Sequence, residues 1–254
     1  MAKIPLAVQL YTVRDLTKDD FVGTIRQIAE LGYTGVELAG FGNLTSAKEV
    51  TKALSNAGLK LAGNHVGIDR LETSIAQVLD ENDALGNKNI LVPWMPEERR
   101  KDAAGWKAVG QLFNRVAAEC HKRGFEFAYH NHSFEFQKFD GKSGLDILWE
   151  NSDPKLVKSE LDTYWVKHGG EDPVAYIRKL GKRILTLHLK DMAAGPEQRF
   201  AEVGSGILDF KSIIEAGKGA GAKWYIVEQD NTYDRPPMES LKTSYQNLKK
   251  LGFA

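Results

Sequence analysis

The stretch that decides the fold is RGFEFAYHNH, residues 123–132, in which a glycine is followed by an apolar strand and then by two histidines. Glycine readily adopts the left-handed conformation found just after a helix, and short loops from a helix to a strand use it in this way. The stretch therefore predicts a helix that ends near Gly124 and a buried strand directly after it. The same order recurs at six glycines along the chain: Gly32, Gly58, Gly86, Gly124, Gly181 and Gly221.

Helical patterns fill the segments between these strands. Residues 21–32 place apolar side chains at helical spacing, and Thr45, Asp172 and Asp209 stand where helix N-caps are expected. Strands that alternate with helices pair in parallel with right-handed crossovers, and eight such units predict a closed (β/α)8 TIM barrel. The eight predicted strands cover residues 4–13, 35–40, 59–66, 89–95, 125–132, 157–166, 184–191 and 223–229.

A single barrel domain over residues 1–254 accounts for this pattern, and no domain boundary is visible in it. An open doubly wound sheet is the alternative. That alternative is weakened because neither GxGxxG nor GxxxxGK[ST], the loops that bind phosphate groups in such sheets, follows the first predicted strand.

The composition argues against several classes of protein. Lys+Arg and Asp+Glu both number 34, so a net charge of zero gives no electrostatic reason to expect nucleic acid or an anionic membrane as partner. Cys120 is the one cysteine, so no disulfide can form within the chain. No apolar run approaches the ~18 residues of a membrane span, and residues 1–15 resemble a first strand more than a secretory signal. The cytoplasm is therefore the expected location.

Polar side chains collect at the C-terminal ends of the predicted strands, which is where the active sites of such barrels lie. Four of the 6 histidines are at these ends: His65, His130, His132 and His188. Alternate residues of a strand point to the same face, so polar residues two apart would project together. Three such pairs occur: His130 with His132, Glu160 with Asp162, and His188 with Lys190.

Several buried carboxylates are costly unless a positive charge offsets them, and a divalent cation is the simplest source of that charge. Mixed imidazole and carboxylate ligands favour Mn²⁺, Co²⁺, Zn²⁺ or Fe²⁺ over Mg²⁺. Four residues at the ends of the last four predicted strands are candidates for such a site: His130, Asp162, His188 and Glu228. Hydrogen bonds to loop carbonyls are an alternative role for any single histidine, but they do not explain all four residues together.

Five motifs give the chain a resemblance to the xylose isomerase-like barrel superfamily of sugar isomerases and epimerases. They are YHNHSFEF (129–136), ELDTYW (160–165), LHLKD (187–191), VGSGILDF (203–210) and IVEQD (226–230). Members hold one divalent metal with an acidic residue of the fifth strand, an Asp of the sixth, a His of the seventh and a Glu of the eighth. Asp162, His188 and Glu228 match the last three positions. His130 stands where epimerases have Glu, which favours an inosose dehydratase-like branch and leaves His130 and His132 as alternative ligands.

The resemblance implies a divalent-metal-dependent isomerase or epimerase that acts on a keto or hydroxy sugar through a metal-stabilised enediolate. His132 or Glu160 would move the proton, and Lys190 would stabilise the developing oxyanion. The residues expected to bind the sugar are Glu37, His65, Glu135 and Trp165. Loss of a β-leaving group from the same intermediate would instead give dehydratase or lyase activity.

Two other functions fit the sequence less well. DNA-repair enzymes of the endonuclease-four type carry a trinuclear zinc site with more histidines, whereas position 165, three residues after Asp162, is a tryptophan here. A non-catalytic sugar binder would not need Asp162, His188 and Glu228 together. Barrels of this superfamily often pair, so a homodimer is expected.

Overall fold

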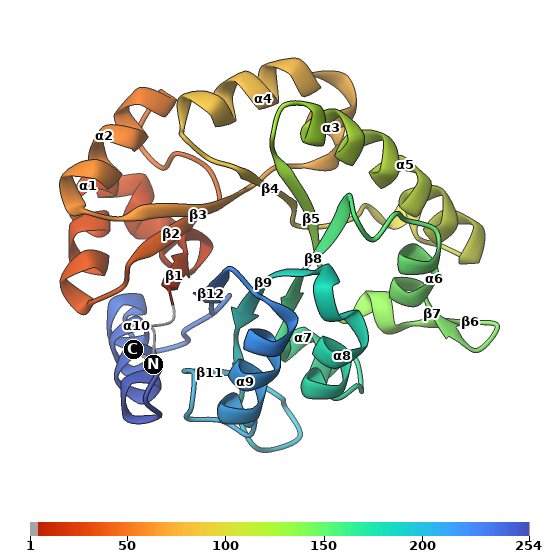
Figure 1. Cartoon of the computed structure of the whole chain (residues 1–254). Coiled ribbons are helices and arrows are strands. Elements are labelled where there is room, and N and C mark those ends of the chain that lie inside the picture. The colour runs from red at the N-terminus through yellow and green to blue at the C-terminus, as the bar shows by residue number, and fades with distance from the viewer. Residues whose placement is uncertain (1–4, 254) are drawn as a thin grey trace.

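The computed structural model describes residues 5–253, in which eight parallel strands close into a barrel (Figure 1). In barrel order they are β1 (Leu6–Gln9), β12 (Trp224–Val227), β9 (Ile184–Leu189), β8 (Val157–Asp162), β5 (Glu126–His130), β4 (Asn89–Val92), β3 (Lys60–His65) and β2 (Gly35–Leu38). Every neighbouring pair in the barrel is parallel, and the predicted (β/α)8 TIM barrel is confirmed.

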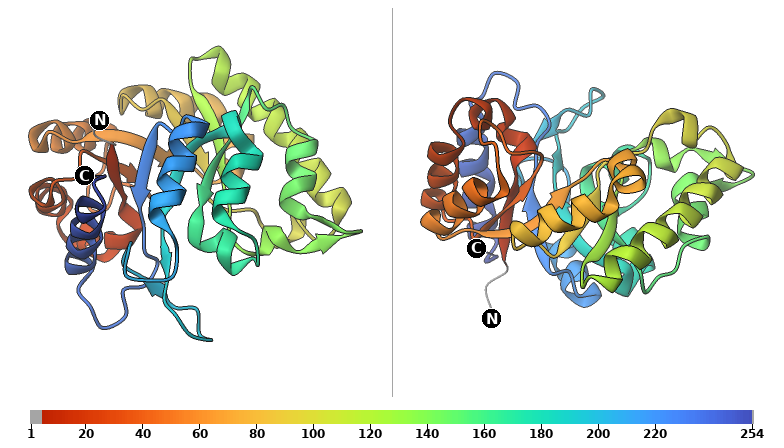
Figure 2. Two further views of the ribbon diagram at one scale, coloured as in Figure 1. Left: turned by 60° about the horizontal axis from the view of Figure 1, so that its bottom comes forward. Right: turned by 90° about the horizontal axis from the view of Figure 1, so that it is seen from above.

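Helices follow each barrel strand and cover the outside of the barrel (Figure 2). They are α1 (Arg14–Leu31), α2 (Ala47–Ala57), α3 (Ile68–Thr73), α4 (Ile75–Ala84), α5 (Ala103–Lys122), α6 (Gly144–Glu150), α7 (Thr163–His168), α8 (Pro173–Leu180), α9 (Phe210–Ala220) and α10 (Pro237–Lys250). Two short antiparallel pairs lie in loops: β6 (Lys138–Phe139) with β7 (Lys142–Ser143), and β10 (Asp191–Met192) with β11 (Phe200–Ala201). Four 3-10 helices complete the elements: η1 (Leu10–Val13), η2 (Glu97–Arg99), η3 (Phe134–Phe136) and η4 (Gly181–Arg183). Within residues 5–253, no helix combines the length and apolarity that crossing a membrane requires.

The ends of the helices follow the sequence signals closely. All six glycines predicted to follow helices have positive φ angles, between 51° and 107°. Asp172 and Asp209 cap α8 and α9 as predicted, because each side chain accepts a hydrogen bond from a backbone N–H of the first turn. The prediction of Thr45 as an N-cap is wrong by one residue. Ser46 caps α2, whereas the backbone N–H of Thr45 donates to the Glu49 side chain.

All eight predicted strands extend too far at their C-terminal ends, by one to four residues. The strand predicted over 4–13 ends at Gln9 and continues as η1, the one predicted over 125–132 ends at His130, and the one predicted over 157–166 ends at Asp162, where α7 begins. After β1 and β8 the chain continues with buried apolar residues such as Leu10, Val13, Tyr164 and Val166, which have the same pattern as a buried strand. His132 therefore lies in a connecting segment and Trp165 in helix α7, and neither lies in a strand.

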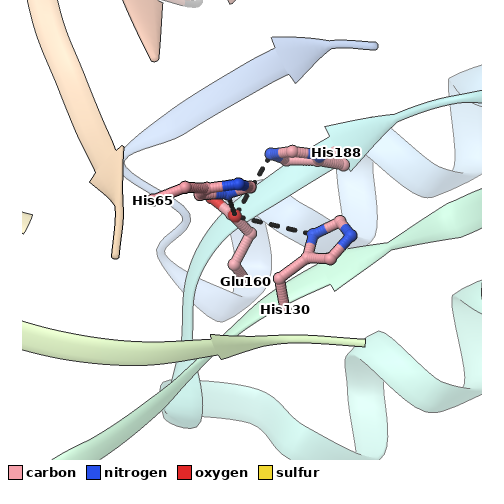
Figure 3. Close-up of side chains that lie close together, drawn as sticks. All are labelled: His65, His130, Glu160 and His188. Atoms are coloured by element: carbon pink, nitrogen blue, oxygen red, sulfur yellow. Dashed lines mark hydrogen bonds and ion pairs between the residues drawn. The ribbon is translucent and has the colours of Figure 1, made fainter. Parts of the chain in front are cut away.

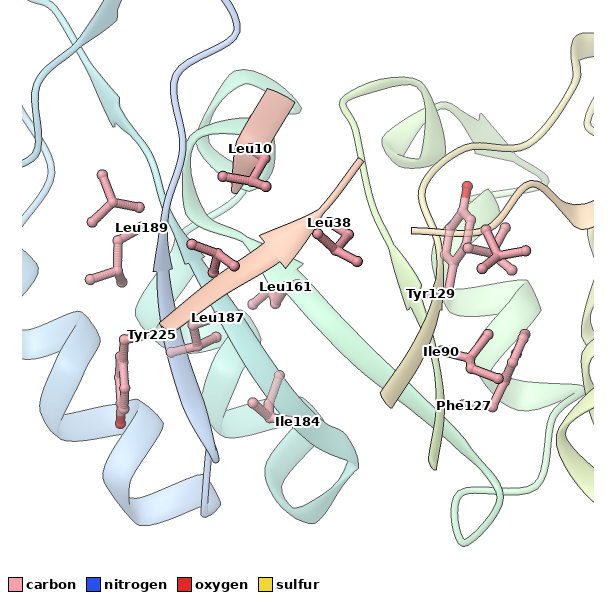
Figure 4. Packing of buried hydrophobic residues seen from close by; sticks show 14 of the residues in the cluster. Leu10, Leu38, Ile90, Phe127, Tyr129, Leu161, Ile184, Leu187, Leu189 and Tyr225 are labelled. Atoms are coloured by element: carbon pink, nitrogen blue, oxygen red, sulfur yellow. The ribbon is translucent and has the colours of Figure 1, made fainter. Parts of the chain in front are cut away.

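The alternation within β5 shows how the barrel separates its core from its site. Phe127 and Tyr129 project from the same face of β5 (Figure 4). They face outward, where the ring of Phe113 from α5 packs against them at centroid distances of 5.2 and 5.3 Å. Ala128 and His130 alternate with these aromatic residues and face the barrel axis. The outward layer thus holds the large apolar side chains, and the inward layer is free to carry polar ones.

Buried apolar residues lie inside the barrel directly beneath the polar residues of the site. Two clusters of fully or almost fully buried residues occur: Ala7 with Ala62 and Ile226, and Leu91 with Ala128 and Leu185. Ala128 and Ile226 each lie two residues before a polar strand-end residue, His130 and Glu228, so each pair shares one face. The polar layer therefore has an apolar layer directly beneath it.

Replacement of Phe113 tests the packing between α5 and the barrel. Phe113→Ala removes a fully buried ring that contacts two strand residues, and we expect it to lower the free energy of unfolding by about 3–5 kcal/mol. Val22→Ala is the control, because Val22 is exposed on α1 and its truncation should change stability by less than about 0.5 kcal/mol. Urea denaturation followed by circular dichroism measures both, and equal midpoints would contradict the described packing.

Candidate functional site

Four side chains from four neighbouring strands converge at the C-terminal end of the barrel. His130 ends β5, Asp162 ends β8, His188 lies in β9 and Glu228 follows β12. One nitrogen or oxygen of each residue lies within 4.8 Å of those of the others, and all four residues are buried. These four residues, which the sequence predicted as metal ligands, are called the outer cluster below.

A second group shares two histidines with the outer cluster. The inner cluster consists of His65, His130, Glu160 and His188 (Figure 3). Glu160 Oε1 lies 2.8 Å from His65 Nε2, 3.2 Å from His188 Nε2 and 3.5 Å from His130 Nδ1. The other oxygen of Glu160 accepts a hydrogen bond from the Thr186 hydroxyl at 2.7 Å. Glu160 is fully buried, so it contacts the imidazoles and does not line the cavity described below.

His188 is held at both ring nitrogens. Its Nε2 lies 2.8 Å from Glu37 Oε1, and its Nδ1 lies 2.9 Å from Glu228 Oε2. Glu37 is fixed in turn by the Gln9 amide, which donates to the same Oε1 at 2.8 Å. A carboxylate that accepts the proton of one ring nitrogen directs the other nitrogen toward a ligand, and this is the usual arrangement behind a metal-binding histidine. Glu37, predicted to bind substrate, therefore supports His188 from below.

Lys190 lies among three carboxylates. Its Nζ donates to Glu228 Oε2 and to Asp230 Oδ1, both at 2.8 Å, and lies 3.3 Å from Asp162 Oδ2. Burial lowers the pKa of Lys190, but these three carboxylates outweigh it and raise the pKa above its usual value. The sequence interpretation missed Asp230. The available signal was its position two residues after Glu228, which repeats the alternation seen at the other strand ends.

The pKa values of three histidines at the site are shifted in different directions. Burial lowers the pKa of His130 to about 4, and it also holds the pKa of His132 well below its usual value. Burial lowers the pKa of His65 too, but the charges of Glu37 and Glu160 outweigh it and raise the pKa to about 10. At neutral pH, His130 and His132 are therefore neutral imidazoles, whereas His65 is an imidazolium that forms ion pairs with the two glutamates.

His132 and Trp165 form an aromatic wall beside the outer cluster. The His132 ring stacks on Phe134 with centroids 5.4 Å apart, and it lies 5.3 Å from the Trp165 ring and 5.0 Å from the His130 ring. Trp165 also contacts Lys190, whose Nζ lies 5.4 Å from its ring centroid. His132 borders the cavity, but Trp165 lies behind it and is not among the lining residues. The sugar contact expected for Trp165 stays a prediction.

The predicted contact of Glu135 with a substrate hydroxyl does not fit the structure. Glu135 is fully buried and does not line the cavity, because both of its oxygens are engaged by the protein. Oε1 accepts a hydrogen bond from the Tyr129 hydroxyl at 2.7 Å, and Oε2 accepts one from the backbone N–H of His132 at 2.8 Å. Glu135 thus fixes the loop that carries His132. Asn131 braces the neighbouring strand, since its Oδ1 accepts the backbone N–H of Asp162.

A cavity of about 460 Å³ opens above the two clusters. Its lining comes from the C-terminal ends of six strands and consists of Tyr11, Ala39, His65, Pro93, Trp94, His130, His132, Glu228 and Asp230. The outer cluster reaches this cavity through His130 and Glu228, and the inner cluster reaches it through His65 and His130. A larger groove of about 870 Å³ is lined mainly by lysines and by residues that precede strands β8 and β9, and it includes no member of either cluster.

The outer cluster fits a divalent cation. It offers two imidazoles and two carboxylates, which suit Zn²⁺, Mn²⁺, Co²⁺ or Fe²⁺ better than Mg²⁺. Among the described residues, the buried atom Asp162 Oδ2 has no hydrogen-bond partner, although it lies 3.3 Å from Lys190 Nζ. Unpaired buried acceptors are costly, and a cation would satisfy them. The inner cluster offers a similar donor set, but its carboxylate is already paired with His65 and Thr186.

Comparison with known proteins gives a family match over most of the chain. Residues 25–251 match the family model of the xylose isomerase-like TIM barrel. The inosose dehydratase of Geobacillus kaustophilus is 28% identical over 195 residues, which are 66% of this chain and 61% of that protein. The inosose dehydratase of Geobacillus thermodenitrificans is 28% identical over 156 residues, 54% of this chain and 52% of that protein. The chain therefore spans only about half to three fifths of the length of these relatives.

Solved structures share the whole fold. A sugar phosphate isomerase/epimerase from Parabacteroides distasonis has a TM-score of 0.86 at 26% identity, with 99% of each chain covered. The IolI protein, whose crystal structure contains a zinc atom, has a TM-score of 0.77 at 13% identity, with 98% of each chain covered. The second likeness concerns the fold alone.

A matched pair of substitutions distinguishes the outer from the inner cluster as the cation site. Asp162→Asn keeps the side-chain shape and the oxygen that caps α7, but it removes the charge, so we expect the affinity for Zn²⁺ or Co²⁺ to fall by about 100-fold. Glu160→Gln removes one buried charge from the inner cluster and should reduce the affinity by a smaller factor. Equilibrium dialysis with elemental analysis measures both, and a larger loss in Glu160→Gln would place the cation in the inner cluster.

The two neighbouring histidines also predict different effects on cation binding. His130→Gln removes a member of the outer cluster and should weaken Co²⁺ binding by roughly tenfold or more. His132→Gln should leave the affinity within about threefold, because His132 belongs to neither cluster. Absorption of the Co²⁺-loaded protein reports the ligand set directly. An unchanged spectrum in His130→Gln together with a changed spectrum in His132→Gln would reverse the assignment.

Proposed function

Because this chain belongs to the xylose isomerase-like TIM barrel family, we propose that it is a metal-dependent dehydratase or lyase that removes a β-leaving group from a keto-sugar or keto-cyclitol. The similarity to inosose dehydratases carries this proposal. His130 stands where epimerases of the family have a glutamate, and this difference supports the proposal. Burial keeps the His130 imidazole neutral, so this position does not supply the second carboxylate that a two-carboxylate acid/base mechanism needs.

The residues that border the cavity supply the groups that elimination requires. His132 borders the cavity beside the outer cluster, and its imidazole would take the proton from the carbon next to the carbonyl. The electron pair of that C–H bond forms the C=C bond as the β C–O bond breaks. The proton taken up by His132 would pass to the departing oxygen, so that water leaves, and the Asp230 carboxylate, held by Lys190, would orient that oxygen. A divalent cation in the outer cluster would supply the positive charge that acidifies the C–H bond.

The other predicted catalytic residues act through their neighbours in this scheme. Glu160 is buried and orients His65, which borders the cavity and would bind a substrate oxygen. Lys190 does not border the cavity, so its predicted role in direct oxyanion stabilisation is replaced by a role in holding Glu228 and Asp230. The protein therefore positions a few cavity-facing groups with several buried ones.

Isomerase or epimerase activity is the second candidate. The observation that favours it is the likeness to the Parabacteroides distasonis sugar phosphate isomerase/epimerase, which extends over nearly the whole chain. The two activities share the abstraction of a proton next to a carbonyl and differ in whether the carbon skeleton then loses an oxygen.

Reaction in D₂O distinguishes the two candidates. The protein supplied with Zn²⁺, Mn²⁺ or Co²⁺ is incubated with a keto-inositol and with keto-hexoses, and nuclear magnetic resonance follows the products. Elimination gives an enol or dicarbonyl product and loss of water, whereas isomerisation gives deuterium at a carbon that keeps its oxygen. We expect elimination, and deuterium uptake without loss of oxygen would establish the second candidate instead.

Replacement of the proposed base tests the assignment within the same assay. His132→Gln should lower kcat by about 10²–10⁴-fold because the proton acceptor is lost. His121→Gln is the matched control, since His121 is exposed on α5 and lies outside both clusters. Equal rates in the two variants would remove His132 from proton transfer.

A further inference from the structure

The mouth of the cavity carries two large aromatic side chains that remain exposed. Tyr11 is 44% exposed and Trp94 is 47% exposed, and both line the cavity. Isolated exposed apolar residues need no explanation, but two at the rim of one polar cavity form a local apolar surface in contact with water. Binding of a partner with an apolar face would cover them.

The positions of the two rings in the barrel place them at opposite ends of the outer cluster. Tyr11 follows β1, which pairs with β12, and Trp94 follows β4, which pairs with β5. The strands between them on this side, from β12 through β9 and β8 to β5, carry the four residues of the outer cluster. A sugar ring that contacts the outer cluster therefore lies between Tyr11 and Trp94.

Both rings are attached to fixed backbone. The backbone N–H of Tyr11 donates to Gln9 Oε1 at 3.0 Å, and the Arg14 guanidinium lies 4.3 Å from the Tyr11 ring centroid. Arg14 also donates to the carbonyl oxygens of Tyr11 and Asp230, which ties the first loop to the last one. Trp94 precedes Met95, which is fully buried and whose carbonyl accepts a hydrogen bond from Arg100. Because the Tyr11 ring packs against Arg14 and the backbone beside both rings is fixed, less conformational freedom is lost when a ligand covers the rim.

The volume of the cavity is larger than the volume that one sugar ring fills. A hydroxylated six-membered ring with twelve non-hydrogen atoms fills roughly 200 Å³ at the packing density of organic solids, less than half of the 460 Å³ available. The inner part of the cavity is polar, with His65, His130, His132, Glu228 and Asp230, and suits hydroxyl and carbonyl oxygens. The aromatic rim suits the apolar C–H face of a second ring.

We propose that the rim formed by Tyr11 and Trp94 is a second subsite, and that the substrate is a two-ring glycoside whose keto-sugar ring occupies the polar part of the cavity. The inference rests on the proposed function and narrows its substrate class. The second ring is a sugar or an aromatic aglycone, since both present an apolar face. A keto-inositol has a single ring and would leave the rim uncovered.

Paired substrates test the second subsite in the cation-supplied protein. A methyl glycoside of a keto-hexose has one ring, whereas a disaccharide and a phenyl glycoside of the same keto-hexose have two. We expect kcat/KM to be about tenfold higher for at least one two-ring compound than for the methyl glycoside. Trp94→Ala and Tyr11→Ala should each reduce this ratio toward one. Tyr233→Ala is the control, because Tyr233 is 43% exposed but does not line the cavity, and it should leave the ratio unchanged.

A binding measurement separates failure of this inference from failure of the proposed function. Calorimetric titration with an unreactive glucose disaccharide and with methyl glucoside does not depend on turnover. Tighter binding of the disaccharide that is lost in Trp94→Ala supports the second subsite even if no compound is eliminated. Equal turnover and equal binding of one-ring and two-ring compounds would overturn the inference, and the proposed elimination would stand if the methyl glycoside still reacts.

Discussion

The site depends on the fixation of His188 by a carboxylate on each side of its ring. Glu37 contacts one ring nitrogen and Glu228 contacts the other, so the imidazole cannot turn without breaking a buried contact. The same ring belongs to both the outer and the inner cluster, and it connects the β2 side of the barrel to the β12 side.

The second constraint is charge. The layer holds five carboxylates and one ammonium group: Glu37, Glu160, Asp162, Glu228, Asp230 and Lys190. Buried charges are tolerated only where partners repay the loss of hydration. Lys190 offsets part of the negative charge on the outer side, and the imidazolium of His65 offsets part of it on the inner side. The remaining negative charge explains why a cation suits the outer cluster.

The sequence predicted the barrel because its signals are local and repeated. Each helix-ending glycine and each apolar strand can be recognised without knowledge of distant contacts. The parallel strand ends also predicted that four side chains would lie close together: His130, Asp162, His188 and Glu228. Features that depend on the loops were not predictable in the same way. The chain turns immediately after β5, so Glu135 reaches back to Tyr129 and the backbone of the His132 loop. Tyr11 gave no signal either, because its exposure depends on how the first loop packs.

Asp162 links the outer cluster to the start of a helix. Its Oδ1 accepts the backbone N–H of Trp165 and so caps α7, while its Oδ2 faces Lys190 and Glu228. With one oxygen engaged by the helix, the carboxylate can offer only the other to a ligand. Helix α7 thereby fixes the orientation of this carboxylate, so that its second oxygen would be the one presented to a cation held by the outer cluster.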